Sequence, residues 1–218
     1  MSQHHPLLPP PRIPEGAEAI RTRRLQRCDA CYLPVQLCLC AEFRPISIRT
    51  QLVLLIHHVE RIRTSNTGRL VERLVPTTIV RVHGDPTRAP HAEVPEGRTL
   101  LLFPHESAAE LSPEMAREEP PPLLVIPDGT WQQAKRMVRR DDLAKRAEMV
   151  RLPEGQTTRY NLRRSTRPGT LSTMEAVAAA LGILEGPDVE EQMLDTFETF
   201  VQRSLYVRTH GTLLQTKT

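Results

Sequence analysis

The sequence predicts an α/β protein in which helices cover both faces of a mainly parallel sheet, giving a three-layer sandwich. Short apolar segments rich in Val, Ile and Leu recur along the chain, as is typical of strands that are buried on both faces. Segments with helical spacing of apolar residues lie between them, and this alternation favours three layers. A third observation, four cysteines confined to one short segment near the N-terminus, predicts a small additional module.

Five segments have the length and composition of buried parallel strands. They are residues 50–58, 77–82, 98–103, 122–127 and 148–152. No apolar stretch approaches the roughly 18 residues that a membrane helix needs. We therefore expect a soluble protein with no membrane partner.

The helices are predicted from apolar spacing and from capping residues. Apolar positions share one face in residues 66–74, in residues 129–140, where Trp131 belongs to the stripe, and in residues 188–208. Ser172 followed by Glu175 is a capping-box pattern that begins a helix over residues 171–184. We also expect a short helix over residues 106–111 and a proline-rich loop over residues 112–122.

All four cysteines lie in the segment CDACYLPVQLCLC, as Cys28, Cys31, Cys38 and Cys40. Thiolates spaced this closely can converge on one tetrahedral cation, and Zn²⁺ prefers sulfur ligands. Four thiolates leave no position for a water, so such a zinc ion would stabilise the fold. An iron–sulfur cluster, disulfides and reduced cysteines are the alternatives, and an intracellular chain argues against disulfides.

The N-terminus lacks the apolar core of a secretory signal, so we expect a cytoplasmic protein. Residues 1–20 carry five prolines and are expected to be a disordered tail. Residues 21–45 form the predicted zinc module. Residues 46–210 form the predicted catalytic domain.

Arginines cluster although the formal net charge is only +3. One cluster contains Arg136, Arg139 and Arg140, and another contains Arg163 and Arg164. Guanidinium groups match phosphate geometry, so these clusters favour RNA, although a solvated surface explains them equally well. The chain is only 4% aromatic, which disfavours a platform for stacking single-stranded nucleic acid.

Asp128 follows a predicted buried strand and precedes a predicted helix. In parallel sheets, ligands bind outside the carboxyl ends of the strands, which makes Asp128 a candidate site residue. It could equally cap the helix that follows, and Trp131 could be a core anchor. We find neither a Rossmann fingerprint, nor a P-loop, nor a legible Ser–His–Asp triad. Asp141 and Asp142 are interpreted as solvated surface.

Six motifs occur in the order CDACYLPVQLCLC, NTGRLVERL, LLFP, DGTWQQAKRM, NLRRS and LSTMEA. Together they resemble the DTW-domain family of tRNA-uridine aminocarboxypropyltransferases, over residues 24–205. The resemblance implies transfer of the 3-amino-3-carboxypropyl group of S-adenosylmethionine to N3 of a tRNA uridine, at position 47 in bacterial members. This forms acp3U and releases methylthioadenosine. It also implies a SPOUT-like domain with a C-terminal trefoil knot that holds the cofactor.

On this resemblance we assign catalytic roles to Asp128, Thr130 and Trp131. Uridine N3 is a poor nucleophile until its proton leaves, so Asp128 is the candidate general base. Thr130 could orient Asp128 or bond the uracil, and Trp131 could wall the pocket or stack on a ring.

The cofactor is expected at strand ends and at the start of the helix near residue 172. An arginine there, Arg163 or Arg164, could clamp its carboxylate or could instead bind phosphate. Ser172 is explained more simply as a helix cap. The candidate cofactor residues are Leu102, Phe103, Pro104, Pro127, Leu162, Arg163, Leu171, Ser172 and Thr173. The candidate RNA-binding residues are Arg136, Arg139, Arg140 and Arg164.

Two other functions remain compatible with the sequence. A SPOUT-like RNA methyltransferase would share the cofactor and fold. A non-catalytic RNA-binding zinc protein would explain the cysteines and arginines and leave the D-x-T-W junction without a role. The sequence leaves open which tRNAs are used, the oligomeric state and how the knot threads.

Overall fold

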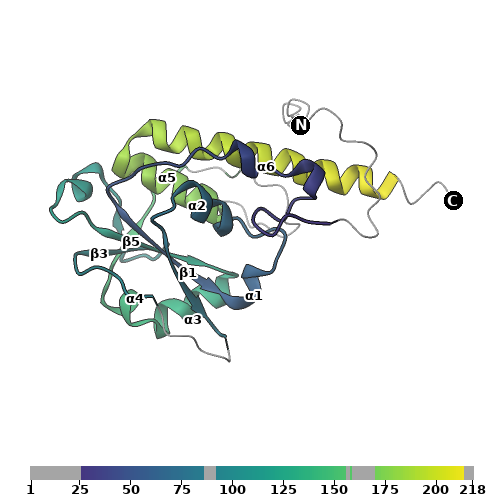
Figure 1. Ribbon diagram of the computed structural model, residues 1–218. Helices are drawn as coiled ribbons and strands as arrows, with labels where there is room; N and C mark the ends of the chain where they lie inside the picture. Colours follow the sequence, from purple (N-terminus) through teal and green to yellow (C-terminus); the bar gives the residue numbers. More distant parts are fainter. Residues whose placement is uncertain (1–25, 86–91, 156–157, 159–169, 214–218) are drawn as a thin grey trace, which may run out of the picture.

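The computed structural model describes residues 26–85, 92–155, 158 and 170–213 (Figure 1). Its centre is a six-stranded sheet in the order β2-β1-β5-β3-β6-β4. All the pairings are parallel. The strands are β1 (Gln51–His57), β2 (Ile79–His83), β3 (Thr99–Leu102), β4 (Ala109–Glu110), β5 (Leu123–Asp128) and β6 (Glu148–Arg151).

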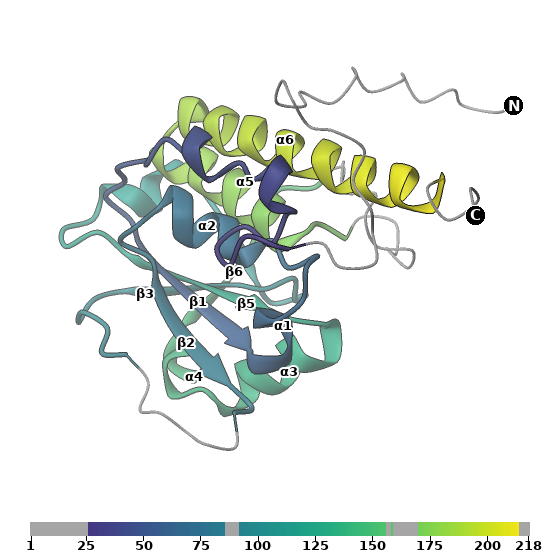
Figure 2. The ribbon, with the colours of Figure 1, turned by 45° about the vertical axis from the view of Figure 1, so that its right-hand side comes forward.

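Helices cover both faces of this sheet, so the predicted three layers are confirmed (Figures 1 and 2). The helices are α1 (His58–Arg61), α2 (Gly68–Leu74), α3 (Trp131–Arg140), α4 (Asp142–Arg146), α5 (Thr173–Glu185) and α6 (Pro187–Leu213). One core forms between the sheet and α2, α5 and α6. The second core forms between the opposite face and α3 and α4. Alternate residues of β1 supply the two cores, for example Leu54 and Leu55, because successive side chains of a strand point to opposite faces.

The four-cysteine segment packs against the first of these cores. It contains two 3₁₀-helices, η2 (Val35–Leu37) and η3 (Cys40–Glu42). Buried Leu33 and Leu39 belong to the same cluster as Phe200 of α6. The Arg203 side chain donates to the carbonyl oxygens of Leu37 and Cys38, at 3.3 and 3.1 Å. The segment is therefore attached to the α/β domain by a shared core and by a buried arginine.

All five predicted strands are present. The prediction failed at residues 106–111, where the two-residue strand β4 replaces the expected helix. Ala109 pairs with Val150 and extends the sheet beyond β6, and so short a pairing produces no periodicity that a sequence could show. The expected loop over residues 112–122 contains a short 3₁₀-helix, η4 (Pro113–Arg117), in which the proline occupies the first turn, where it is tolerated.

Among the described residues, no helix is both long enough and apolar enough to cross a membrane.

Candidate active site

Asp128 is the last residue of β5, at the carboxyl edge of the sheet. Strand β5 lies between β1 and β3, and Asp128 is paired with Ile56 near the end of β1. Only 3% of Asp128 is exposed. A carboxylate this buried requires hydrogen-bond donors, because leaving it unpaired would cost several kcal/mol.

Two neutral side chains supply donors to the Asp128 carboxylate. The Asn66 Nδ2 atom donates to Oδ2 at 2.6 Å, and the Thr173 hydroxyl donates to Oδ1 at 2.6 Å. Asn66 precedes α2, and Thr173 is the first residue of α5. Three of the motifs noted in the sequence, NTGRLVERL, DGTWQQAKRM and LSTMEA, therefore meet at one carboxylate.

Asp128 does not cap the helix that follows it, so the capping alternative is wrong. Thr130 is the N-cap of α3: its hydroxyl accepts from the backbone N–H of Gln133 at 3.4 Å, and the Gln133 side chain accepts from the backbone N–H of Thr130 at 2.6 Å. This reciprocal capping box provides acceptors for the backbone N–H groups of Thr130 and Gln133 at the start of α3 without Asp128.

Gly68 is required where α2 passes closest to Asp128. A Cβ atom on Gly68 would lie 2.4 Å from the Asp128 Oδ2 atom, well inside van der Waals contact. The backbone of α2 can approach the carboxylate only because residue 68 has no side chain.

Trp131 is not a core anchor. It is 46% exposed, whereas Ala134 and Met137 form the buried face of α3. The indole stacks on Phe103, which follows β3, with ring centroids 5.0 Å apart and planes inclined by 6°. The Lys135 ammonium lies 5.2 Å from the indole centroid. Phe103 thus supports an exposed aromatic surface beside the carboxyl ends of β3 and β5.

The candidate cofactor residues that the structure describes gather at this same edge. Leu102 and Phe103 are buried at the end of β3, and Pro104 is exposed after it. Pro127 precedes Asp128 in β5. Leu171, Ser172 and Thr173 lie at the start of α5, where Ser172 and Glu175 form the predicted capping box. Leu162, Arg163 and Arg164 lie outside the described residues.

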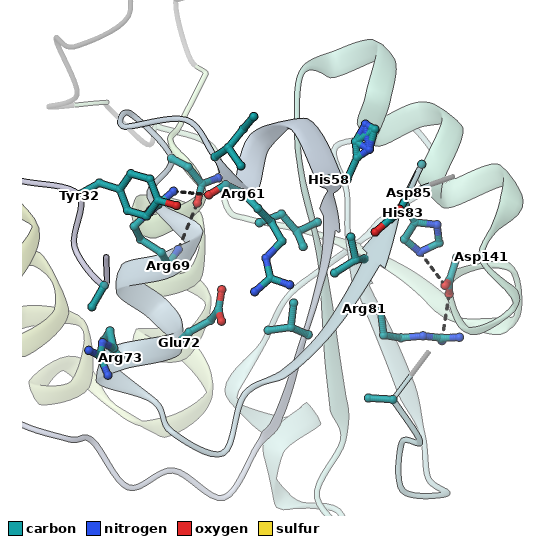
Figure 3. A pocket seen from close by; sticks show the side chains of 18 of the residues that line it. Tyr32, His58, Arg61, Arg69, Glu72, Arg73, Arg81, His83, Asp85 and Asp141 are labelled. Carbon is teal, nitrogen blue, oxygen red and sulfur yellow. Dashed lines mark hydrogen bonds and ion pairs between the residues drawn. The ribbon is translucent and has the colours of Figure 1, made fainter. Parts of the chain in front are cut away.

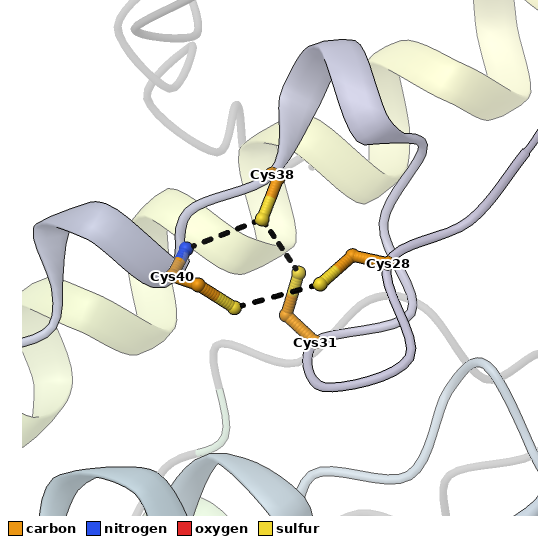
Figure 4. A group of neighbouring side chains, drawn as sticks. All are labelled: Cys28, Cys31, Cys38 and Cys40. Carbon is orange, nitrogen blue, oxygen red and sulfur yellow. Dashed lines mark hydrogen bonds between the residues drawn. The ribbon is translucent and has the colours of Figure 1, made fainter.

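The four cysteines converge as predicted, and their sulfur atoms all lie within 4.8 Å of one another (Figure 4). Two of the Sγ–Sγ distances are 3.6 Å, between Cys28 and Cys40, and 3.8 Å, between Cys31 and Cys38. A tetrahedron with Zn–S bonds of about 2.3 Å has edges of about 3.8 Å, so the sulfur positions fit zinc.

Within this cluster, the pKa is lowered for one thiol and raised for two others. A hydrogen bond from the backbone N–H of Cys31 is the main cause that lowers the pKa of Cys28 to about 6. Burial raises the pKa of Cys31 and of Cys40. A divalent cation would supply the positive charge that lets all four sulfurs ionise together.

The candidate RNA-binding residues Arg136, Arg139 and Arg140 are all exposed on α3. Arg139 and Arg140 lie in its last turn, where basic side chains interact favourably with the helix dipole. They follow Trp131 on the same helix, so the arginines and the exposed aromatic surface belong to one element.

An open groove of about 1370 Å³ lies between the cysteine segment, α2 and the outer edge of β2 (Figure 3). It reaches Asn66. Among the described residues, five arginines and five carboxylates line it, so these residues give it no excess of positive charge for a polyanion. They are Arg61, Arg69, Arg73, Arg81, Arg140, Asp29, Glu72, Asp85, Asp141 and Asp142.

Asp141 lines this groove. The sequence-based interpretation of Asp141 as solvated surface is wrong, because the residue is buried. It is 3% exposed and caps α4 by accepting from the backbone N–H groups of Leu143 and Ala144. It also pairs with Arg81 at 3.3 Å and with His83 at 3.0 Å. The sequence pattern failed because the partners of Asp141 lie on β2, about 60 residues earlier.

Sequence reasoning also missed Asn66, Gly68 and Arg69 as contributors to the site. All three lie in the motif NTGRLVERL, which was interpreted as a helix with one apolar face and as one of the six family motifs, with no role given to these residues. The available signal was the Asn-Thr-Gly-Arg run, since Asn and Gly are unfavourable within an apolar helical pattern.

Comparisons with known proteins agree with this arrangement. The family model described as the DTW domain matches residues 25–205. The chain is 29% identical over 200 residues to tRNA-uridine aminocarboxypropyltransferase 2 of Drosophila melanogaster, covering 87% of this chain and 79% of the relative. It is 30% identical over 175 residues to the Macaca fascicularis protein of the same name, covering 75% of this chain and 58% of that protein.

A solved structure, the SAM-dependent rRNA:acp-transferase Tsr3 from Vulcanisaeta distributa, is similar with a TM-score of 0.46 and 19% identity, covering 74% of this chain and 81% of that one. The family model spans most of the chain and all the segments that meet at Asp128. The chain therefore belongs to the DTW domain family.

Proposed function

We propose that this protein is a tRNA-uridine aminocarboxypropyltransferase that uses S-adenosylmethionine. Two relatives that match across most of this chain carry that name. The observation that carries the proposal is the convergence of three motifs on the buried carboxylate of Asp128, beside an exposed aromatic surface.

The reaction joins uridine N3 to Cγ of the methionine moiety. The N3–Cγ bond forms, the Cγ–S bond breaks, and the sulfonium becomes the neutral thioether methylthioadenosine. The N3 proton goes to a base. Asp128 is our candidate because it is a carboxylate at the carboxyl edge of the sheet, where ligands of such sheets bind. Asn66 and Thr173 hold both of its oxygens, which supports a fixed orientation.

Trp131 and Phe103 are placed to contact a planar ring. Their stacked pair keeps the indole fixed while nearly half of Trp131 stays exposed. A nucleobase stacked there would lie next to the end of β5. Thr130 fixes the start of α3 and thereby the direction in which Trp131 projects.

The co-substrate site is proposed at the ends of β3 and β5 and the start of α5, from Leu102, Phe103, Pro104, Pro127, Leu171, Ser172 and Thr173. Leu162 and Arg163 complete the proposed set, with Arg163 or Arg164 binding the carboxylate of the amino-acid moiety. S-adenosylmethionine carries its own activated leaving group, so the chemistry that this chain must supply is orientation of Cγ and acceptance of a proton.

The arginines of α3 are the proposed contact to the tRNA backbone. Arg136, Arg139 and Arg140 are exposed on the helix that begins with Trp131, so phosphates bound there would lead towards Asp128. Arg164 belongs to the same proposal.

Zinc is the proposed occupant of the four-cysteine cluster. The Sγ–Sγ distances fit its tetrahedral shell, and four thiolates close that shell, so the ion would stabilise the segment without reaching the transferred group. Metal analysis of the purified protein tests this assignment.

Three finer features remain predictions. The family resemblance implies the C-terminal trefoil knot and the uridine at position 47 of the variable loop as the target, and the N-terminal sequence implies a cytoplasmic location.

The function is tested by mass spectrometry of nucleosides from a tRNA pool incubated with the purified protein and S-adenosylmethionine. We expect acp3U and an equal amount of methylthioadenosine. Methylated nucleosides with S-adenosylhomocysteine would instead identify a methyltransferase. Binding of tRNA without any modified nucleoside would identify a non-catalytic RNA-binding protein.

A further inference from the structure

Asn66 is fully buried, and both polar atoms of its side chain are engaged. Its Nδ2 atom donates to Asp128 Oδ2 at 2.6 Å, and its Oδ1 atom accepts from the backbone N–H of Arg69 at 3.2 Å. The second bond defines the orientation of the amide, because turning it over would place Oδ1 against the carboxylate and Nδ2 against an N–H. Asn66 therefore presents its Nδ2 donor, and not its carbonyl oxygen, to Asp128.

The segment that carries Asn66 is itself held in place by Arg69. The Arg69 guanidinium donates to the carbonyl oxygens of Arg61 and Arg63, at 2.6 and 2.9 Å. The backbone N–H of Asn66 donates to the same Arg63 carbonyl at 3.0 Å. Arg69 is only 8% exposed, so it acts as an internal brace between α1 and α2.

Arg69 also contacts the four-cysteine segment. Its guanidinium carbon lies 3.5 Å from the centroid of the Tyr32 ring, and Figure 3 shows the two side chains side by side. Tyr32 directly follows Cys31, has a positive φ of 59°, and donates its backbone N–H to the carbonyl of Cys28 at 2.9 Å. The tight turn between the cysteines thus sets the direction of the Tyr32 ring.

We infer that Asn66 is a positioning residue that orients the Asp128 carboxylate for the transfer reaction, and that Arg69, packed against Tyr32, holds Asn66 in that role. This inference rests on the proposed function. In this role Asn66 acts through Asp128 and needs no contact with the transferred group. It keeps Oδ2 in one place, while Thr173 holds Oδ1.

The loss of Asn66 would leave a buried carboxylate oxygen without this donor. The carboxylate would then rotate or shift towards other donors, and small displacements of a reacting group cost large factors in rate. A residue that acts only through Asp128 has no effect once the carboxylate is gone. A residue with a general structural role lowers the rate in either background.

The test is a double-mutant cycle between Asn66→Ala and Asp128→Asn, measured as single-turnover transfer from S-adenosylmethionine to tRNA. We expect Asn66→Ala to lower the transfer rate by on the order of tenfold to a hundredfold in the native background, with KM for both substrates changed by less than about threefold. In the Asp128→Asn background, the same substitution changes the residual rate by less than about twofold. Equal losses in both backgrounds would overturn the inference.

If Asn66→Ala does not fold, Asn66→Leu replaces it in the same cycle. That variant is close to Asn in size and removes the donor without placing a second charge beside Asp128, and the same two outcomes decide. The Tyr32 contact is tested by Tyr32→Leu against Tyr32→Phe. We expect about threefold slower transfer for Leu and an unchanged rate for Phe, since only Phe keeps the ring under Arg69. Equal rates in both would remove Tyr32 and Arg69 from the proposal.

A wild-type protein that transfers nothing would refute the proposed function. An active wild-type protein with additive losses would refute only the role of Asn66.

Discussion

Asp128 and Asp141 are both 3% exposed, yet the two sites are built from different partners. Asp141 is held by two backbone N–H groups and by two basic side chains, Arg81 and His83. Among the contacts of Asp128 are a hydrogen bond from the Asn66 amide and one from the Thr173 hydroxyl. The comparison teaches that burial alone does not mark a functional carboxylate: Asp141 caps a helix and pairs with Arg81 and His83, whereas three separate motifs meet at Asp128.

Arg81 forms an ion pair with one oxygen of Asp141, and His83 hydrogen-bonds the other. Burial by itself would raise the pKa of Asp141, but hydrogen bonds from His83 and the Ala144 N–H, together with the charge of Arg81, outweigh burial and lower the pKa. Such a group is fixed in one state at neutral pH and stabilises the fold. The Asn66 amide and the Thr173 hydroxyl fix the orientation of Asp128 without carrying a charge themselves, which suits a group that must accept a proton.

The largest predicted effect on stability is for Asp141→Ala. Removing it uncaps α4 and leaves Arg81 and His83 beside an empty position, which costs about 3 to 5 kcal/mol in free energy of unfolding. For a chain of this length, that lowers Tm by about 6 to 20 °C. The neighbouring Asp142 is the matched control, because its side chain is 92% exposed and its pair with Lys145 is a surface pair. We expect Asp142→Ala to change stability by less than about 0.5 kcal/mol. Equal losses in both variants would show that Asp141 is not a structural anchor.

The contribution of Asp141 depends on pH in a defined direction. Its folded pKa lies below the unfolded value of about 3.9, so its stabilisation is complete above about pH 4 and is lost as pH falls through the folded pKa. Urea unfolding of wild type and Asp141→Asn between pH 3 and pH 7 measures this. We expect a smaller difference at pH 3 than at pH 5. A difference that grows on acidification would contradict the assigned partners.

A smaller effect, on tRNA affinity, is expected for Arg139 and Arg140 in the last turn of α3, the helix that follows Asp128 in the chain. Reversing Arg139 and Arg140 to Glu should lower tRNA affinity and reduce the slope of log affinity against log salt by about 2, because two phosphate contacts are lost. Arg44→Glu with Arg117→Glu is a control of equal charge change. Both control residues are exposed and belong to segments that pack with α6 or α5, across the sheet from α3. Equal weakening by both double variants would mean that only net charge matters.

The strands, the capping box at Ser172 and the cysteine cluster could be predicted because each depends on residues close together in sequence. Asp128 could be selected because strand ends in parallel sheets bind ligands. Its partners could not, since Asn66 and Thr173 lie 62 and 45 residues away. Asp141 was misassigned for the same reason. Helical spacing favoured a core position for Trp131, and the family resemblance a wall or stacking role. The structure exposes Trp131, because it stacks on Phe103, which follows β3.

The most direct test of the account compares transfer by Asp128→Asn and Asp141→Asn under single-turnover conditions, after both proteins are shown to be folded and to bind S-adenosylmethionine. Asn at position 128 keeps the size of the side chain and can accept from Asn66, but it cannot take a proton at neutral pH. We predict that Asp128→Asn transfers at least about a hundredfold more slowly, the usual contribution of a positioned general base. We predict that Asp141→Asn transfers within about threefold of wild type below its lowered Tm. Near wild-type transfer by Asp128→Asn would contradict the account, and the base would then have to be sought among other residues.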